Sequence, residues 1–156
     1  IIHANAENPQ VDPSTTRDIK NLESMLSFEN IENNFIFNYL DYLLWLKHKQ
    51  SDPKIRDYKF TFRSSVEHYY PQSPMPGHTP LPLKTLNSFG NLCLISHSKN
   101  SRLSNFMPNA KKEYYQGNSI DSIKQHLMMN EKYLYWNAES ITNHYEEMKN
   151  ILLQGI

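Results

Sequence analysis

The sequence is poor in the residues that several common kinds of site require. Its 156 residues include one cysteine, Cys93, and four glycines. One cysteine excludes an internal disulfide framework and a cysteine-based zinc knuckle, and it is compatible with a reducing cytosol. Neither GxxxxGK nor GxGxxG occurs in the chain, which excludes the glycine-rich loops that bind nucleotide phosphates.

The chain also lacks the long apolar run that a membrane span needs. Ile1, Ile2 and His3 are followed by polar residues, so no signal peptide is visible. We therefore expect a cytoplasmic protein without a membrane partner. The first residue is not methionine, and we expect the chain to be the C-terminal fragment of a longer protein.

Positive charge is concentrated in the middle of the chain, although the formal net charge is zero. Residues 59–115 contain seven basic and two acidic residues, a net charge of +5, whereas residues 1–58 and 116–156 carry −3 and −2. A polyanionic substrate requires such a positive segment. Chance clustering of surface charge is the alternative.

Apolar periodicity predicts helices in both terminal thirds of the chain. We expect helices at about 16–26, 34–49, 119–129 and 138–153, with Ser119 as the cap of the third, and irregular structure over residues 1–16. The helix at 34–49 has a broad apolar face, and Ile141, Tyr145 and Met148 recur at helical spacing in the last one. Both helices are predicted to pack in the core.

The middle of the chain follows a different pattern. Residues 58–63 alternate aromatic and polar side chains, which predicts a strand, and residues 91–95 predict a second strand with a helix beginning near Lys99. The five prolines between residues 71 and 82 predict a loop. We expect one α+β domain, with a helical part at about 16–50, a core at about 58–115 and C-terminal helices at about 119–153.

Four polar residues of this core fit the hydrolysis of phosphodiesters. Glu67 and Asn100 offer a carboxylate and an amide oxygen, which suit Mg²⁺ with water completing the coordination. His68 is the candidate general base, because a neutral imidazole accepts a proton near neutral pH. Asn91 would fix the orientation of that imidazole through its side chain or its backbone carbonyl.

Each of these residues also has an ordinary structural interpretation. Glu67 could form a salt bridge with Arg63 or a lysine, Asn100 could cap a helix, and Asn91 could be a turn residue. Adjacent strand residues point to opposite faces, so β structure must twist, bulge or end near His68 for both neighbours to face one site. Four basic residues are candidate phosphate contacts or ordinary solvated side chains: Lys99, Arg102, Lys111 and Lys112.

The combined motif resembles that of the HNH, or ββα-metal (His-Me finger), endonucleases. The segment Glu67-His68-x-x-Pro71-Gln72 is followed by Gly90-Asn91-Leu92 and Lys99-Asn100-Ser101. With Lys111-Lys112 after it, this order is similar to the C-terminal HNH-type domain of GmrSD-like, modification-dependent (type IV) restriction enzymes. The resemblance covers residues 64–114 specifically and residues 34–153 loosely.

The resemblance implies a ββα-metal motif in a mostly helical domain that cleaves DNA in restriction or defence. It implies His68 as the base, Asn91 as its orienting partner, and Glu67 and Asn100 as ligands of Mg²⁺ or Mn²⁺. Asparagine at position 100, where many relatives have histidine, favours these ions over zinc. A nucleotide-hydrolysing domain would precede this one in the full-length protein.

Two alternatives stay open from the sequence. One is a catalytically inactive module that binds nucleic acid or a partner within a restriction complex. The other is a helical interaction domain in which the motif has arisen by chance. The arrangement of Glu67, His68 and Asn100 in space distinguishes them from a nuclease, because only a nuclease needs all three at one site.

Overall fold

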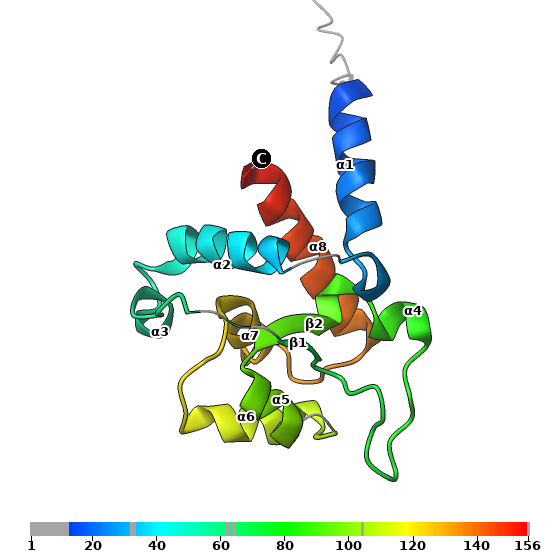
Figure 1. The fold of residues 1–156 in the computed structure, drawn as a ribbon, viewed down its shortest axis with the longest axis vertical. Coiled ribbons are helices and arrows are strands. Elements are labelled where there is room, and N and C mark those ends of the chain that lie inside the picture. Colours follow the sequence, from blue (N-terminus) through cyan, green and yellow to red (C-terminus); the bar gives the residue numbers. More distant parts are fainter. Residues whose placement is uncertain (1–12, 32–33, 62, 64, 104, 156) are drawn as a thin grey trace, which may run out of the picture.

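A small antiparallel sheet lies at the centre of a mostly helical domain (Figure 1). The computed structural model describes residues 13–31, 34–61, 63, 65–103 and 105–155. In chain order its elements are α1 Pro13–Met25, η1 Phe28–Asn30, α2 Phe35–His48, α3 Pro53–Arg56, β1 Ser65–His68, α4 Leu83–Leu86, η2 Phe89–Asn91, β2 Leu92–Ile95, α5 His97–Leu103, α6 Pro108–Gln116, α7 Ile123–Met128 and α8 Ala138–Gly155.

The two strands pair so that Glu67 and His68 stand at the end of the sheet where β2 begins. In the antiparallel register Glu67 is opposite Cys93 and His68 is opposite Leu92. Helix α5 follows β2 almost directly, so the middle of the chain has the order strand, loop, strand, helix. The small sheet among many helices agrees with the predicted α+β class.

β2 is buried on both faces, which explains its continuous apolar sequence. Leu92 and Leu94 pack into a core formed largely by α2, α8 and η2. Cys93 and Ile95, on the opposite face, pack into a second core with Tyr69, Trp136 and Ile141. The strand is therefore held between two apolar clusters, and its position is fixed from both sides.

Helix α8 crosses η2 at close range, and this contact positions the start of β2. A side chain added at Gly90 would collide with the backbone carbonyl oxygen of Ile141 and would lie 3.0 Å from the Cβ of Tyr145. Glycine is thus required here for close approach of two backbones. The predicted core role of the last helix is confirmed, since Ile141 and Met148 are buried.

The long helix predictions agree with the structure, whereas several local predictions do not. The helices expected at 34–49 and 138–153 are α2 and α8, and the proline-rich residues 71–82 are irregular. Helix α1 already begins at Pro13, and residues 1–12 lie outside the described part of the chain. Ser122, not Ser119, caps α7, because its Oγ accepts a hydrogen bond from the Gln125 backbone N–H at 3.2 Å.

The strand predicted at 58–63 is wrong for residues 58–61 and 63, which are irregular; Phe62 lies outside the described residues. The aromatic side chains pack sideways instead: the Phe60 ring contacts Tyr58 at 5.0 Å and Trp45 at 6.5 Å between centroids. Tyr58 Oη also donates to the Asp121 carbonyl at 2.9 Å. The aromatic residues in this alternating segment therefore anchor it through side-chain packing, and they do not belong to a paired strand.

Within the described residues, no helix combines the length and the apolarity needed to cross a membrane.

Candidate active site

A pocket of about 300 Å³ between β1 and α5 contains three of the four residues predicted to carry the chemistry. Glu67, His68 and Asn100 line it together. The remaining lining residues are Phe28, Val66, Gln72, Ser73 and Asn105. The structure thus brings a carboxylate, an imidazole and an amide from distant parts of the chain to one place.

Neighbouring Glu67 and His68 both reach this pocket because the strand ends there. β1 stops at His68, and the following backbone bends at Tyr69 and Tyr70. The Tyr69 N–H donates to the Asn91 carbonyl at 2.8 Å, which holds this bend against the start of β2. The expected early end of the strand is confirmed.

Glu67 is a buried carboxylate whose charge is compensated by a buried lysine. Lys111 from α6 places its Nζ 3.1 Å from Glu67 Oε1, and the two side chains are 1% and 3% exposed. The ammonium donates two of its hydrogens to the His68 and Tyr69 carbonyls, so its third can face Glu67 Oε1. Burial raises the pKa of Glu67, and the positive charge of Lys111 opposes that rise.

This arrangement fits a hard divalent cation. Glu67 brings a carboxylate to the pocket, and Asn100 brings an amide oxygen to the same pocket. Mg²⁺ prefers oxygen ligands and keeps several waters, so one carboxylate and one amide suffice as protein ligands. Among the described residues no group of three His, Cys, Asp or Glu side chains could hold a metal ion.

His68 is held by residues that the sequence did not point to. Its Nε2 lies 2.8 Å from Asn87 Oδ1, and the Phe28 ring packs against the imidazole at 4.7 Å between centroids. Burial lowers the pKa of His68, although the hydrogen bond with Asn87 acts in the opposite direction. Asn87 lies just after α4 and, from sequence alone, resembles an ordinary turn residue.

Asn91 supports the chain beside His68 but its side chain does not bond the imidazole. Its Oδ1 accepts from the Tyr70 N–H at 2.8 Å and from Trp136 Nε1 at 2.9 Å. Its Nδ2 donates to the Tyr70 and Leu86 carbonyls at 3.1 and 3.0 Å. The expected direct contact with the His68 ring is therefore made by Asn87, while Asn91 fixes the backbone that follows the histidine.

The four basic residues predicted to contact phosphate lie in different environments. Lys111 is buried and bonds the carbonyls of His68 and Tyr69 at 2.9 and 3.1 Å, so it is not a surface contact and that prediction does not hold. Lys99 pairs with Asp121 at 3.2 Å. Arg102 is exposed on α5, and Lys112 is half-buried.

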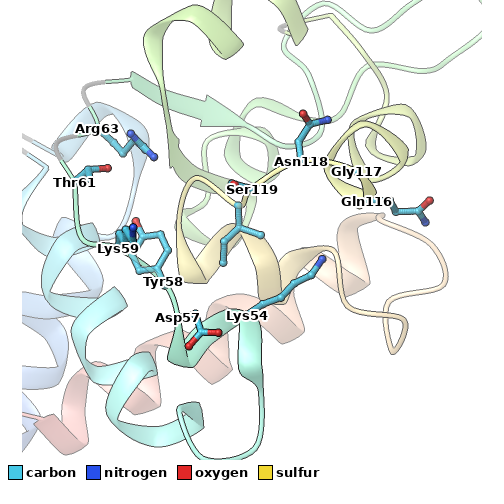
Figure 2. A pocket seen from close by; sticks show the side chains of 11 residues that line it. Lys54, Asp57, Tyr58, Lys59, Thr61, Arg63, Gln116, Gly117, Asn118 and Ser119 are labelled. Atoms are coloured by element: carbon cyan, nitrogen blue, oxygen red, sulfur yellow. The ribbon is translucent and has the colours of Figure 1, made fainter.

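A second, wider cleft of about 720 Å³ lies at the other end of β1 (Figure 2). One wall consists of residues 54, 57–59, 61 and 63, and residues 116–120 form the other. The first wall carries Lys54, Lys59 and Arg63 against one carboxylate, Asp57, which already binds Arg56 at 3.0 Å. The lining of this cleft is therefore positively charged.

A comparison with protein-family models matches residues 16–151 to the C-terminal domain of GmrSD restriction endonucleases. The chain belongs to this family. The resemblance found in the motif is thereby confirmed, and the match to the GmrSD C-terminal domain extends over η1, α2 and most of α8 as well as the sheet. No curated protein and no solved structure matched the chain.

Proposed function

We propose that this GmrSD-type domain is a divalent-metal-dependent endonuclease of the HNH type that hydrolyses phosphodiester bonds in DNA. The observation that carries the proposal is the convergence of Glu67, His68 and Asn100 on one pocket. The choice of target, and any dependence on nucleotide hydrolysis, would belong to other domains of the restriction enzyme. Mg²⁺ is the expected ion, with Mn²⁺ as a substitute.

The residues of the pocket divide the reaction among them. A water molecule attacks the phosphorus while His68 takes one of its protons, and the bond from phosphorus to the leaving sugar oxygen breaks. That oxygen is protonated from solvent. Glu67 and Asn100 would hold the cation, which, when bound, compensates negative charge on the phosphate and on the leaving oxygen.

The first experiment separates cleavage from metal binding. With supercoiled plasmid and MgCl₂, the protein should nick DNA, and His68→Ala should lose at least about 100-fold in rate because a general base contributes on that order. Mn²⁺ binding measured by calorimetry should persist in His68→Ala. Glu67→Gln and Asn100→Ala should weaken it, because each removes or neutralises an oxygen ligand.

Matched controls are available in the same chain. His78→Ala changes an exposed histidine of the proline-rich loop, and Asn109→Ala changes an exposed asparagine at the start of α6. Both should cleave DNA and bind Mn²⁺ as the unmodified protein does. DNA binding without cleavage in Mg²⁺ or Mn²⁺ would instead favour an inactive nucleic-acid-binding module, and loss of Mn²⁺ binding in folded His68→Ala would overturn the assigned roles.

We also propose that the basic cleft docks the phosphate backbone of the substrate. Lys54 and Lys59 are exposed, and neither forms an ion pair with another described residue. Arg63 and Lys99 share one carboxylate, Asp121, at 3.4 and 3.2 Å, which leaves an excess positive charge beside the cleft. Arg102 and Lys112 stay candidate contacts, whereas the buried Lys111 does not.

Salt dependence tests this docking surface. Each phosphate contact adds about 0.9 to the slope of log affinity against log salt, so Lys54→Gln/Lys59→Gln should lower the slope by about 2. The double variant Lys20→Gln/Lys47→Gln removes the same charge from exposed positions on α1 and α2. Equal slopes in the two double variants would show that the cleft does not bind phosphate.

A further inference from the structure

A short chain of hydrogen bonds connects the N-terminal part of the domain to His68. Glu29 in η1 accepts a hydrogen bond from Asn87 Nδ2 at 2.6 Å, and Asn87 Oδ1 lies 2.8 Å from His68 Nε2. Glu29 and Asn87 both lie outside the strands and the helix of the motif. The motif therefore receives support for its histidine from a part of the chain that precedes it by almost forty residues.

The partners at each end fix the direction of every bond in this chain. A carboxylate only accepts, so the Asn87 nitrogen must face Glu29 and its oxygen must face the imidazole. The pKa of Glu29 is lowered by a backbone hydrogen bond and by Asn87, in agreement with an ionised carboxylate. Because the amide oxygen can only accept, His68 Nε2 must carry a hydrogen and donate it.

The backbone holds Glu29 and Asn87 in register with each other. The Phe28 N–H donates to the Asn87 carbonyl at 2.9 Å, and the Phe89 N–H donates to the Leu26 carbonyl at 3.3 Å. Ser27 and Ser88 form a bridge between these two hydrogen bonds. Two segments distant in sequence thus meet as a short antiparallel pair, which places Glu29 where Asn87 can reach it.

We propose that Asn87 and Glu29 are positioning residues that hold His68 with its hydrogen on Nε2, so that Nδ1 is the nitrogen that takes the proton from the attacking water. The proposal rests on the proposed nuclease function for the role of His68. The assignment of the hydrogen rests on geometry alone. Asn87 acts through His68 and is assigned no contact with substrate.

Nitrogen NMR tests the position of the hydrogen without any cleavage assay. In ¹⁵N-histidine-labelled protein above the pKa of the ring, long-range ¹H–¹⁵N correlations should show a protonated Nε2 and an unprotonated Nδ1 for His68. The signal is assigned by its absence in His68→Ala. A free imidazole also favours this tautomer in water, so a second measurement is needed. The Nε2 hydrogen should exchange slowly with solvent, and its exchange should become fast in Asn87→Leu.

Kinetics test the positioning role. Asn87→Leu and Glu29→Ala should lower kcat by about 10-fold or more, a part of what a general base supplies, with the KM for DNA and the affinity for Mn²⁺ unchanged. Glu29→Gln keeps an oxygen that accepts from Asn87 and should retain most of the rate. Glu23→Ala, which removes an exposed carboxylate of α1 that pairs with Lys149, is the matched control.

The outcomes distinguish this proposal from the proposed function. A hydrogen on Nδ1 of His68 overturns the positioning proposal whether or not the protein cleaves DNA. If cleavage depends on His68 but Asn87→Leu and Glu29→Ala behave as Glu23→Ala does, the nuclease stands and the positioning role is wrong. If neither the unmodified protein nor any variant cleaves DNA but the NMR result is as expected, the nuclease function fails and the hydrogen assignment stands.

Discussion

Two buried lysines lie beside the two strands of the sheet, and they differ in what neutralises their charge. Lys111 binds the carbonyls of His68 and Tyr69 at the end of β1. Lys124 binds the carbonyls of Phe89 and Leu92 at the start of β2, at 2.9 and 2.5 Å. Each side chain is 1% exposed. In both places an ammonium group binds backbone oxygens next to the motif.

The difference lies in the acidic partner. Lys111 stands 3.1 Å from the carboxylate of Glu67, so the two buried charges offset each other. Lys124 makes no ion pair with a described side chain; Asp41 Oδ1 accepts instead from its backbone N–H. Burial lowers the pKa of Lys124 to about 7. Lys111, which binds the end of β1, is thus part of the candidate active site. Lys124, which binds the start of β2, serves the structure of the sheet.

The largest effect is expected when Lys111 is replaced by methionine. Lys111→Met leaves the Glu67 carboxylate buried without its cation, and breaking such a pair from one side costs about 3–5 kcal/mol. Urea unfolding followed by circular dichroism measures the loss. The variant should also bind Mn²⁺ at least as tightly as the unmodified protein wherever it is still folded, because a competing cation has been removed from Glu67.

A double variant separates charge from packing at this end of the sheet. Lys111→Met/Glu67→Gln has no uncompensated charge and should be more stable than Lys111→Met alone. Lys112→Met, at the neighbouring half-buried position of α6, should stay within about 0.5 kcal/mol of the unmodified protein. Equal stability of the single and double variants would show that the ion pair does not distinguish the two lysines.

The next largest effect is expected at Gly90, beside the carbonyls that Lys124 binds at the start of β2. Gly90→Ala forces η2 and α8 apart, because the new methyl group meets the backbone oxygen of Ile141, not a flexible side chain. Overpacking of this kind costs about 1–3 kcal/mol, and we expect a value near the upper limit. Thermal and urea unfolding measure it.

Gly117→Ala is the matched control, since nothing lies within 4 Å of its added Cβ and its φ is −101°. The stability of that variant should be unchanged or slightly higher, because alanine lowers the conformational entropy of the unfolded chain. A small effect at Gly90 would mean that backbone packing does not hold the start of β2. Lys124 would then carry more of that task than the comparison assigns to it.

The sequence predicts those parts of the fold that depend on local pattern. Helices α2 and α8 follow from apolar periodicity, β2 from its short apolar run, and the loop at 71–82 from its prolines. The strand expected at 58–63 is absent from the described residues there. The prediction failed because alternating aromatic side chains do not reveal whether they pack against a residue such as Trp45 or line a sheet. Pairing partners are a property of the fold, which the local pattern does not contain.

The same limit applies to the candidate site. Glu67, His68 and Asn100 could be selected because their residue types and spacing match a motif, and the structure places them on one pocket. Asn87 and Glu29 carry no such signal, since their proximity to His68 depends on two distant segments meeting. Nothing in the sequence marks Lys111 as buried, since most lysines are exposed, and its burial depends on tertiary contacts alone.

At pH 7 the smallest effect is expected for Lys124, and this effect should depend on pH. Lys124→Met removes a donor from the Leu92 carbonyl, while the Phe89 carbonyl still accepts from the Leu92 N–H, so the cost at pH 7 should be about 1–2 kcal/mol. With a pKa of about 7 when folded and an ordinary lysine pKa when unfolded, Lys124 binds its proton more strongly in the unfolded chain. Stability therefore rises with pH above 7.

Lys124→Met lacks this rise in stability. Its loss of unfolding free energy relative to the unmodified protein should therefore grow by about 2 kcal/mol between pH 7 and pH 9. Urea unfolding at both pH values measures the deficit. Lys20→Met, at an exposed position of α1, should show a constant difference. If the deficit of Lys124→Met is also constant, the ammonium at the start of β2 is compensated by a charge such as Asp41, and the two lysines are electrostatically alike.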